Sequence, residues 1–170
     1  MSNREPLLVL GGVVSVTLAV YLTMVLWSLP RIADWAGGLA PFDLRPLGYS
    51  PEEARAFLAA LPVEGRAFYL TVQHKLDLAY PGLMALSLIL AFRRLAPGGM
   101  ALAMGLLAAA GAGFDYAENA AVSGLLAGVP TDAAVIAASR LTLAKSACTT
   151  LALSVLLILL VRAGLRRWRG

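Results

Sequence analysis

The chain has little charge, one cysteine and one histidine, and each shortage excludes a class of protein. Asp, Glu, Lys and Arg make up 14% of its 170 residues, whereas hydrophobic residues make up 59%. Because a soluble domain carries about a quarter charged residues, this composition excludes an ordinary soluble protein. Its apolar content also excludes a disordered one. The net charge of +4 comes from arginines near the ends of hydrophobic segments, which excludes a soluble nucleic-acid binder.

The scarcity of cysteine and histidine also restricts the metal chemistry that we expect. Cys148 alone allows neither a disulfide within the chain nor a zinc site built on cysteines. His74 alone argues against a histidine-rich metal or haem site. The sequence also has no nucleotide-binding, nucleophile-elbow or metalloprotease motif. We therefore expect no metal site and no cofactor.

Long hydrophobic segments determine the predicted architecture. A transmembrane helix needs about 20 predominantly apolar residues, and we predict spans at about 6–29, 68–92, 100–129 and 133–161. The first segment is too long for the core of a signal peptide, so we expect it to be retained. Residues 1–170 are then one integral membrane domain, a polytopic, all-α bundle of four transmembrane helices.

The outer loop, residues 30–67, contains a strong signal for the start of a helix. Ser50 is a favoured N-cap residue, and Pro51 and two glutamates follow it in the first turn. Helical spacing then places Phe57, Leu58 and Leu61 on one face. We predict a short amphipathic helix over the outer mouth of the bundle. It covers a cavity there or lies as a surface helix among lipid headgroups.

Basic residues predict the orientation of the spans. An even number of spans places both termini on one side of the membrane. That side would hold seven arginines and the other side four. The first group is Arg4, Arg93, Arg94, Arg162, Arg166, Arg167 and Arg169, and the second is Arg31, Arg45, Arg55 and Arg66. The positive-inside rule therefore predicts cytoplasmic termini, in a bacterial inner membrane.

Every span carries a polar side chain at about the same depth. At a rise of 1.5 Å per residue, Asp77 is expected about 24 Å from the cytoplasmic edge. Tyr21, Asp115 and Lys145 are expected at about 26 to 27 Å. Residues one turn away extend this layer on the same helical stripes: Gln73, His74, Glu118 and Asn119.

The third span cannot easily enter the membrane alone. A charge at the centre of a spanning helix costs about 2.5–3.5 kcal/mol, whereas each leucine returns only about 0.3–0.6 kcal/mol. We therefore expect this span at the centre of the bundle, with Asp115 and Glu118 facing the second and fourth spans. Lys145 can neutralise one acid, and one of the three carboxyls, which include Asp77, is expected to be protonated. Four small residues would allow close packing: Ala101, Gly105, Ala109 and Gly113.

The polar layer predicts a binding protein for a lipid-like or amphipathic small molecule. The expected contacts are Tyr21, Gln73, Asp77, Asp115, Glu118, Asn119 and Lys145. If the chain is an enzyme, acid–base chemistry such as isomerisation would use Asp115 as the principal carboxyl, Asp77 as its counterpart and His74 as a proton shuttle. A proton-linked transporter or channel is one alternative. A structural or assembly subunit is another, with membrane lipids, a second copy or another membrane protein as partner.

Two polar strings resemble a known membrane family. They are His74-Lys75-Leu76-Asp77-Leu78-Ala79-Tyr80-Pro81 and Asp115-Tyr116-Ala117-Glu118-Asn119. With four spans and a long first outer loop, the chain is similar in architecture to the membrane-embedded family of sterol isomerases and the sigma-2 receptor. The resemblance implies that acidic groups recognise an amine or a cationic intermediate of a sterol-like ligand. Asp77 and Asp115 or Glu118 would then face the ligand. Lys145 departs from this pattern, since it competes for the acids.

Overall fold

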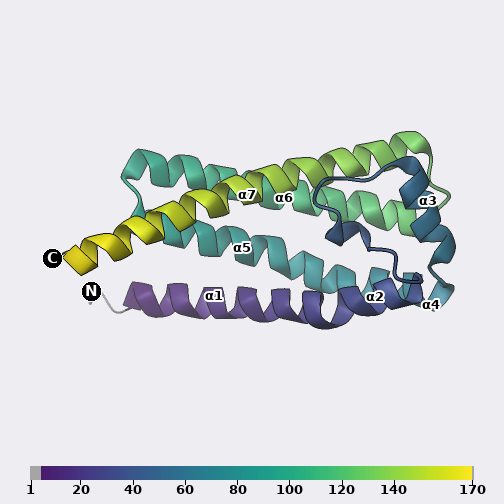
Figure 1. Ribbon diagram of the computed structural model, residues 1–170, viewed down its shortest axis with the longest axis horizontal. Coiled ribbons are helices and arrows are strands. Elements are labelled where there is room, and N and C mark those ends of the chain that lie inside the picture. The colour runs from purple at the N-terminus through teal and green to yellow at the C-terminus, as the bar shows by residue number, and fades with distance from the viewer. Residues whose placement is uncertain (1–4, 170) are drawn as a thin grey trace.

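The protein is a bundle of four long helices (Figure 1). The computed structural model describes residues 5–169, and this part of the chain contains no β-strand. Arg4 lies outside the described residues, as does the side chain of Arg169. Four helical stretches are long and apolar enough to cross a membrane: Leu7–Trp35, Val63–Leu95, Gly98–Ala127 and Asp132–Trp168. The predicted all-α architecture of a multi-pass membrane protein is confirmed.

Three helices form the core of the bundle. Helix α6 (Gly98–Ala127) packs against both α5 (His74–Leu95) and α7 (Asp132–Arg169). The first and last helices run to the same end of the bundle, which we call the terminal end, and the outer loop covers the opposite loop end (Figure 1). The third hydrophobic segment therefore has the central position expected for it.

The predicted small-residue stripe is wrong at two of its positions. Ala109 and Gly113 are exposed. The close approach of α6 to α7 occurs at Gly111, where an added Cβ would lie 3.2 Å from the Cβ of Cys148. Ala108, one turn before Gly111, is buried as well. The face of α6 that approaches α7 therefore carries Ala108 and Gly111, and the stripe predicted through Ala109 and Gly113 is displaced from it around the helix.

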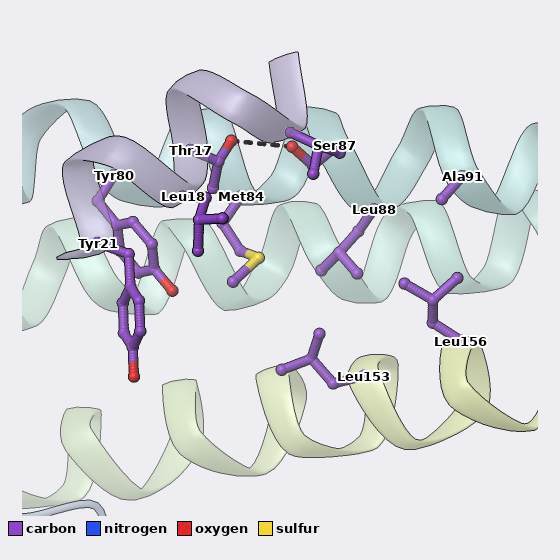
Figure 2. Close-up of a pocket in the computed structure, with 11 residues that line it drawn as sticks. Thr17, Leu18, Tyr21, Tyr80, Met84, Ser87, Leu88, Ala91, Leu153 and Leu156 are labelled. Carbon is purple, nitrogen blue, oxygen red and sulfur yellow. Dashed lines mark hydrogen bonds between the residues drawn. The ribbon is translucent and has the colours of Figure 1, made fainter. Parts of the chain in front are cut away.

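Helix α1 (Glu5–Thr23) stands at the edge of the core and packs mainly against α5. A hydrogen bond of 2.9 Å joins Thr17 Oγ1 to Ser87 Oγ (Figure 2). The Thr17 hydroxyl donates to the Val13 carbonyl at 2.8 Å, so Ser87 is the donor to Thr17. Both hydroxyls are thereby satisfied within an apolar environment, as helix packing in a membrane requires.

Two helices are longer at the loop end than the spans predicted at 6–29 and 68–92. A π-helical turn, η1 (Met24–Ser28), carries the first helix into α2 (Leu29–Trp35). The second begins with α4 (Val63–Phe68) and a second π-helical turn, η3 (Tyr69–Gln73). Pro30 does not end the first helix: the π-helical turn η1 directly precedes α2, and α2 continues to Trp35.

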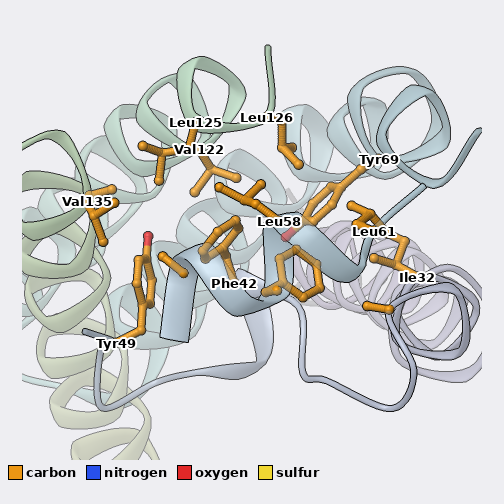
Figure 3. Close-up of a cluster of buried hydrophobic side chains, with 14 residues drawn as sticks. Ile32, Phe42, Tyr49, Leu58, Leu61, Tyr69, Val122, Leu125, Leu126 and Val135 are labelled. Atoms are coloured by element: carbon orange, nitrogen blue, oxygen red, sulfur yellow. The ribbon is translucent and has the colours of Figure 1, made fainter. Parts of the chain in front are cut away.

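Helix α3 (Pro51–Ala60) crosses the loop end, as the sequence predicts. Ser50 and Glu53 form a reciprocal capping box, in which Glu53 N donates to Ser50 Oγ at 3.2 Å and Ser50 N donates to Glu53 Oε2 at 2.7 Å. Phe57, Leu58 and Leu61 are buried in an apolar cluster shared with the long helices (Figure 3). Of the two predictions for α3, the one in which it covers the end of the bundle is thus the better. However, α3 lies over packed side chains, where the prediction has a cavity.

Two arginines fasten the cover to the bundle. The Arg66 guanidinium donates to the carbonyls of Leu58 and Leu61 at the end of α3, and to that of Leu126 at the end of α6. Arg55 of α3 pairs with Asp132 at the start of α7. Because the last carbonyls of a helix have no partner within it, Arg66 satisfies two helix ends at once.

Candidate functional site

An ion cluster joins α6 to α7 and brings together three of the residues that the sequence predicts for the polar layer. Lys145 Nζ lies 3.1 Å from Asp115 Oδ1 and contacts Glu118 Oε2. The two acids are three residues apart, so they share one face of α6. Thr142, one turn before Lys145, donates to Glu118 Oε1 at 2.5 Å. With both carboxylates ionised, the cluster of one cation and two anions has a net negative charge.

Tyr49 covers the ion cluster from the outer loop, and the sequence analysis did not identify it. Its N–H donates to Ser139 Oγ on α7 at 2.9 Å. Burial, and the nearby carboxylate of Glu118, raise the pKa of the Tyr49 phenol. Gly48 makes this contact possible, since it has a φ of 80° and an added Cβ would lie 2.6 Å from Ser139 Oγ. In the sequence, the glycine that precedes Tyr49 was the only signal for this contact.

Asp77 belongs to a second polar group, separate from the Lys145 cluster. Its carboxylate accepts hydrogen bonds from Gln73 Nε2 at 3.2 and 3.1 Å. The Gln73 oxygen in turn accepts from Ser28 Oγ at 2.5 Å. This chain of contacts joins the two π-helical turns, because Ser28 ends η1 and Gln73 ends η3. Among the described side chains, none forms an ion pair with Asp77.

Pro81 explains the position of Asn119 on α6, and Tyr116 bonds to the next carbonyl of α5. A proline inside a helix leaves the carbonyl four residues earlier without its usual donor, and here that carbonyl belongs to Asp77. Asn119 Nδ2 donates to it at 3.1 Å. Tyr116 OH donates to the neighbouring Leu78 carbonyl at 3.1 Å. The predicted binding residue Asn119 is therefore engaged with the backbone of α5.

His74 bonds neither to the Lys145 cluster nor to the carboxylate of Asp77. Its Nδ1 is 3.4 Å from Ser123 Oγ on α6, and its side chain is half-buried. It borders a cavity of about 10 Å³ that Asp77 and Asn119 also line. A volume of about 10–15 Å³ is enough for one water molecule and no more. His74 and Asp77, which the sequence places one turn apart, thus line the same small cavity. No direct hydrogen bond joins these two described side chains.

The large cavity next to the polar residues is a cleft between α1, α5 and α7 (Figure 2). We call it the α1–α7 cleft, and its volume is about 440 Å³. Its lining residues are Val14, Thr17, Leu18, Tyr21, Tyr80, Met84, Ser87, Leu88, Ala91, Leu153 and Leu156. Tyr21 and Tyr80 stack at one end of it, with ring centroids 5.7 Å apart. The cleft is therefore apolar along its length and carries phenol groups at one end.

A smaller cavity extends from the cleft towards the ion cluster. It measures about 30 Å³, and Asp115 and Thr149 supply its polar wall. Tyr80, Met84 and Leu88 line both this cavity and the α1–α7 cleft. The second oxygen of Asp115 has no hydrogen bond to any side chain that the structure describes. Asp115 thus lines a cavity that shares three of its residues with the α1–α7 cleft.

The residues predicted from the sequence fall into three separate environments. Tyr21 lines the cleft, Asp115 borders it, and Glu118 and Lys145 lie behind Asp115. The others, Gln73, His74, Asp77 and Asn119, form contacts between helices. Tyr80 was missed, although its place three residues after Asp77 puts it near the same helical stripe. Within residues 5–169, no three metal-ligating side chains are grouped as a metal ion requires.

Comparison with known proteins adds no further assignment. No protein-family model, curated protein or solved structure matches this chain.

Proposed function

We propose that the protein binds a lipid-like or amphipathic small molecule in the α1–α7 cleft. The observation that carries this proposal is the cleft itself, about 440 Å³ in volume, which shares Tyr80, Met84 and Leu88 with the cavity that Asp115 lines. Ligand pockets are typically about 300–1,000 Å³, mostly apolar, with a few polar groups that orient the ligand. The cleft meets each of these criteria.

The lining of the cleft favours a ligand with one long apolar part. Leu18, Leu88, Leu153 and Leu156 provide aliphatic surface along its length. The hydroxyls of Thr17 and Ser87 bind each other, so they offer no free donor to a ligand there. A polar group on the ligand would therefore find its partners only at the end where the tyrosines lie.

Asp115 is the residue that we propose for recognition of the polar group. Lys145 lies closer to Glu118 than to Asp115, and Thr142 also donates to Glu118. Glu118 is thus held by two partners, whereas Asp115 has one. Because the cluster carries net negative charge, a cationic or hydrogen-bond-donating head group suits it best. The resemblance to the sterol-isomerase and sigma-2-receptor family leads to the same ligand class.

The acid–base reaction considered from the sequence would require Asp115 to act alone at the cleft. Asp77 and His74 line a separate small cavity, and this cavity has no lining residue in common with the α1–α7 cleft. We therefore propose binding as the primary function, with Asp115 as the one carboxyl available for proton transfer to a bound molecule.

Mass spectrometry of the protein purified in mild detergent tests the binding proposal. Leu153 lines the cleft, and Leu157, one turn along α7, is exposed and lines no cavity described here. We expect a defined hydrophobic molecule to stay bound to the wild type and to the L157W variant, and to be lost from L153W, in which the indole fills the cleft. Equal retention by both variants, or a wild type that carries only detergent and bulk lipid, would contradict the proposal.

The role of Asp115 is tested with the same bound molecule. A hydrogen bond to a charged group contributes about 1.5–3 kcal/mol, so D115N should weaken binding about tenfold or more. D34N is the matched control, because Asp34 is exposed on α2 at the loop end. Proton flux into liposomes that D115N abolishes would instead favour the transporter. Co-purification of a protein partner, with neither ligand nor flux, would favour the assembly subunit.

We also propose that both termini lie in the cytoplasm of a bacterium, with the bundle in the inner membrane. The argument is the excess of arginine at the terminal end. The four arginines of the loop end are engaged locally: Arg31 over Trp35, Arg45 with the Ala40 carbonyl, Arg55 with Asp132, and Arg66 with helix ends. Their presence on the outer side therefore has a structural explanation.

A further inference from the structure

A second cavity, unrelated to the α1–α7 cleft, lies at the terminal end of the bundle. We call it the basic groove; its volume is about 480 Å³, between the turn that joins α5 to α6 and the last turns of α7. Arg94 comes from the end of α5. Arg162 and Arg166 are four residues apart on α7 and so lie on one face. Residues far apart in the sequence thus bring three guanidinium groups to one groove.

The positive charge of the basic groove is not balanced by the protein. No acidic residue lines the groove. Among the side chains that the structure describes, none pairs with Arg94, Arg162 or Arg166. Helix α6 also begins here, and no side chain caps its first turn at Pro97. Its free N–H groups and the positive end of its dipole add to the positive potential.

The rest of the groove wall is apolar. Leu95, Met100 and Leu159 line it between the arginines. The groove lies where the membrane-spanning stretches ending at Leu95 and beginning at Gly98 meet the last turns of α7. Positive charge at the end of spanning helices, next to exposed aliphatic surface, matches a molecule that carries a phosphate on an acyl chain. A soluble phosphate would match the charge alone.

We infer that the basic groove binds the phosphate headgroup of an anionic phospholipid, with the first part of an acyl chain along Leu95 and Leu159. The three guanidinium groups would repel the choline of a zwitterionic lipid, whereas an anionic phospholipid such as phosphatidylglycerol brings no cation to the groove. Each arginine near a membrane surface strengthens attraction to anionic lipid about fivefold. The inference does not depend on which side of the membrane the terminal end faces, or on the ligand of the α1–α7 cleft.

Lipid retention in native mass spectrometry tests the inference, with two probes of equal chain length: dioleoyl phosphatidylglycerol and dioleoyl phosphatidylcholine. The wild type should retain one phosphatidylglycerol in preference to phosphatidylcholine. The double variant R94Q/R162Q should weaken that retention about 25-fold, at fivefold for each arginine. The matched control is R93Q/R167Q, which removes the same charge from exposed arginines at the same end, outside the basic groove.

Three outcomes would overturn the inference. The first is equal retention of the two lipids by the wild type. The second is an equal loss of phosphatidylglycerol from R94Q/R162Q and R93Q/R167Q, which would indicate diffuse attraction to the whole basic end. The third is binding of glycerol phosphate that R94Q/R162Q abolishes while neither lipid is preferred, which would assign the groove to a soluble phosphate. Circular dichroism of both double variants verifies that the helices remain intact.

Discussion

At the scale of single residues, Pro81 accounts for the polar side chain of Asn119 on α6. Its ring removes the N–H that would satisfy the Asp77 carbonyl, and Asn119 supplies the missing donor. Gly82 leaves room for the Tyr116 hydroxyl, which would lie 2.8 Å from an added Cβ. A polar side chain in a transmembrane helix can thus be required by a proline on the neighbouring helix, without any ligand.

A double-mutant cycle tests the dependence of Asn119 on Pro81. N119L should lower the free energy of unfolding by about 0.6–1.7 kcal/mol, the range measured for hydrogen bonds between helices in membranes. In P81A the new N–H of residue 81 can donate to the Asp77 carbonyl. In that background N119L should therefore lower the free energy of unfolding by clearly less. Unfolding in sodium dodecyl sulfate measures each value. Additive effects would show that Asn119 acts elsewhere.

The ion cluster makes a second prediction at this scale. K145M should lower the free energy of unfolding by about 3–5 kcal/mol, because Asp115 and the buried Glu118 lose the one cation that pairs with them among the described side chains. The triple variant K145M/D115N/E118Q should recover most of this loss, since no unpaired charge remains. K75M is the control, because Lys75 is exposed on α5. The prediction is wrong if K145M unfolds like the wild type.

At the scale of elements, local signals predicted α3 well and the ends of the long helices poorly. The Ser50 capping box and the buried face of Phe57 follow from neighbouring residues in the sequence, and both are present. The π-helical turns carry no such local signal, because each extra residue is accommodated by contacts with another helix. The uncharged apolar run predicted an end at residue 29, and α2 continues to Trp35.

The attachment of α3 makes a prediction at the scale of the element. R66M removes the donor to the carbonyls of Leu58, Leu61 and Leu126. Hydrogen bonds to charged groups contribute about 1.5–3 kcal/mol, so amide hydrogen exchange should accelerate in α3 and in the last turn of α6. Exchange in α5 and α7 should change little. R140M, at an exposed arginine of α7, is the control; unchanged protection of α3 in R66M would contradict the prediction.

At the scale of the whole molecule, the sequence predicted the four long helices and the approach of Lys145 to the acids of α6. Hydropathy and residue counting suffice for these, because membrane thickness and helical rise are fixed. They did not locate the α1–α7 cleft, which depends on how far α1 stands from α7. They also did not separate Asp77 from the Lys145 cluster, because depth alone does not give the direction of a side chain around its helix.

The arrangement of the helices predicts which positions share a side of the membrane. In a C148S background, which lacks other cysteines, we expect W168C and G98C to react with an impermeant thiol reagent from one side. L47C and V129C should react only from the other side; both positions are highly exposed at the loop end. Labelling of intact cells and of inverted vesicles distinguishes the sides. Labelling of W168C and V129C from the same side would contradict the bundle.

The position of α1 has a consequence for how the chain enters the membrane during synthesis. The first span has a mean hydropathy of 2.2, and those that contain α5 and α6 have 1.4 each. Helix α1 leaves the ribosome before α5, its main neighbour, has been made, and its composition lets the translocon release it into lipid unaided. Helix α6 carries two acids and meets Lys145 only after α7 emerges. The last two helices should therefore enter the bilayer together, as a hairpin.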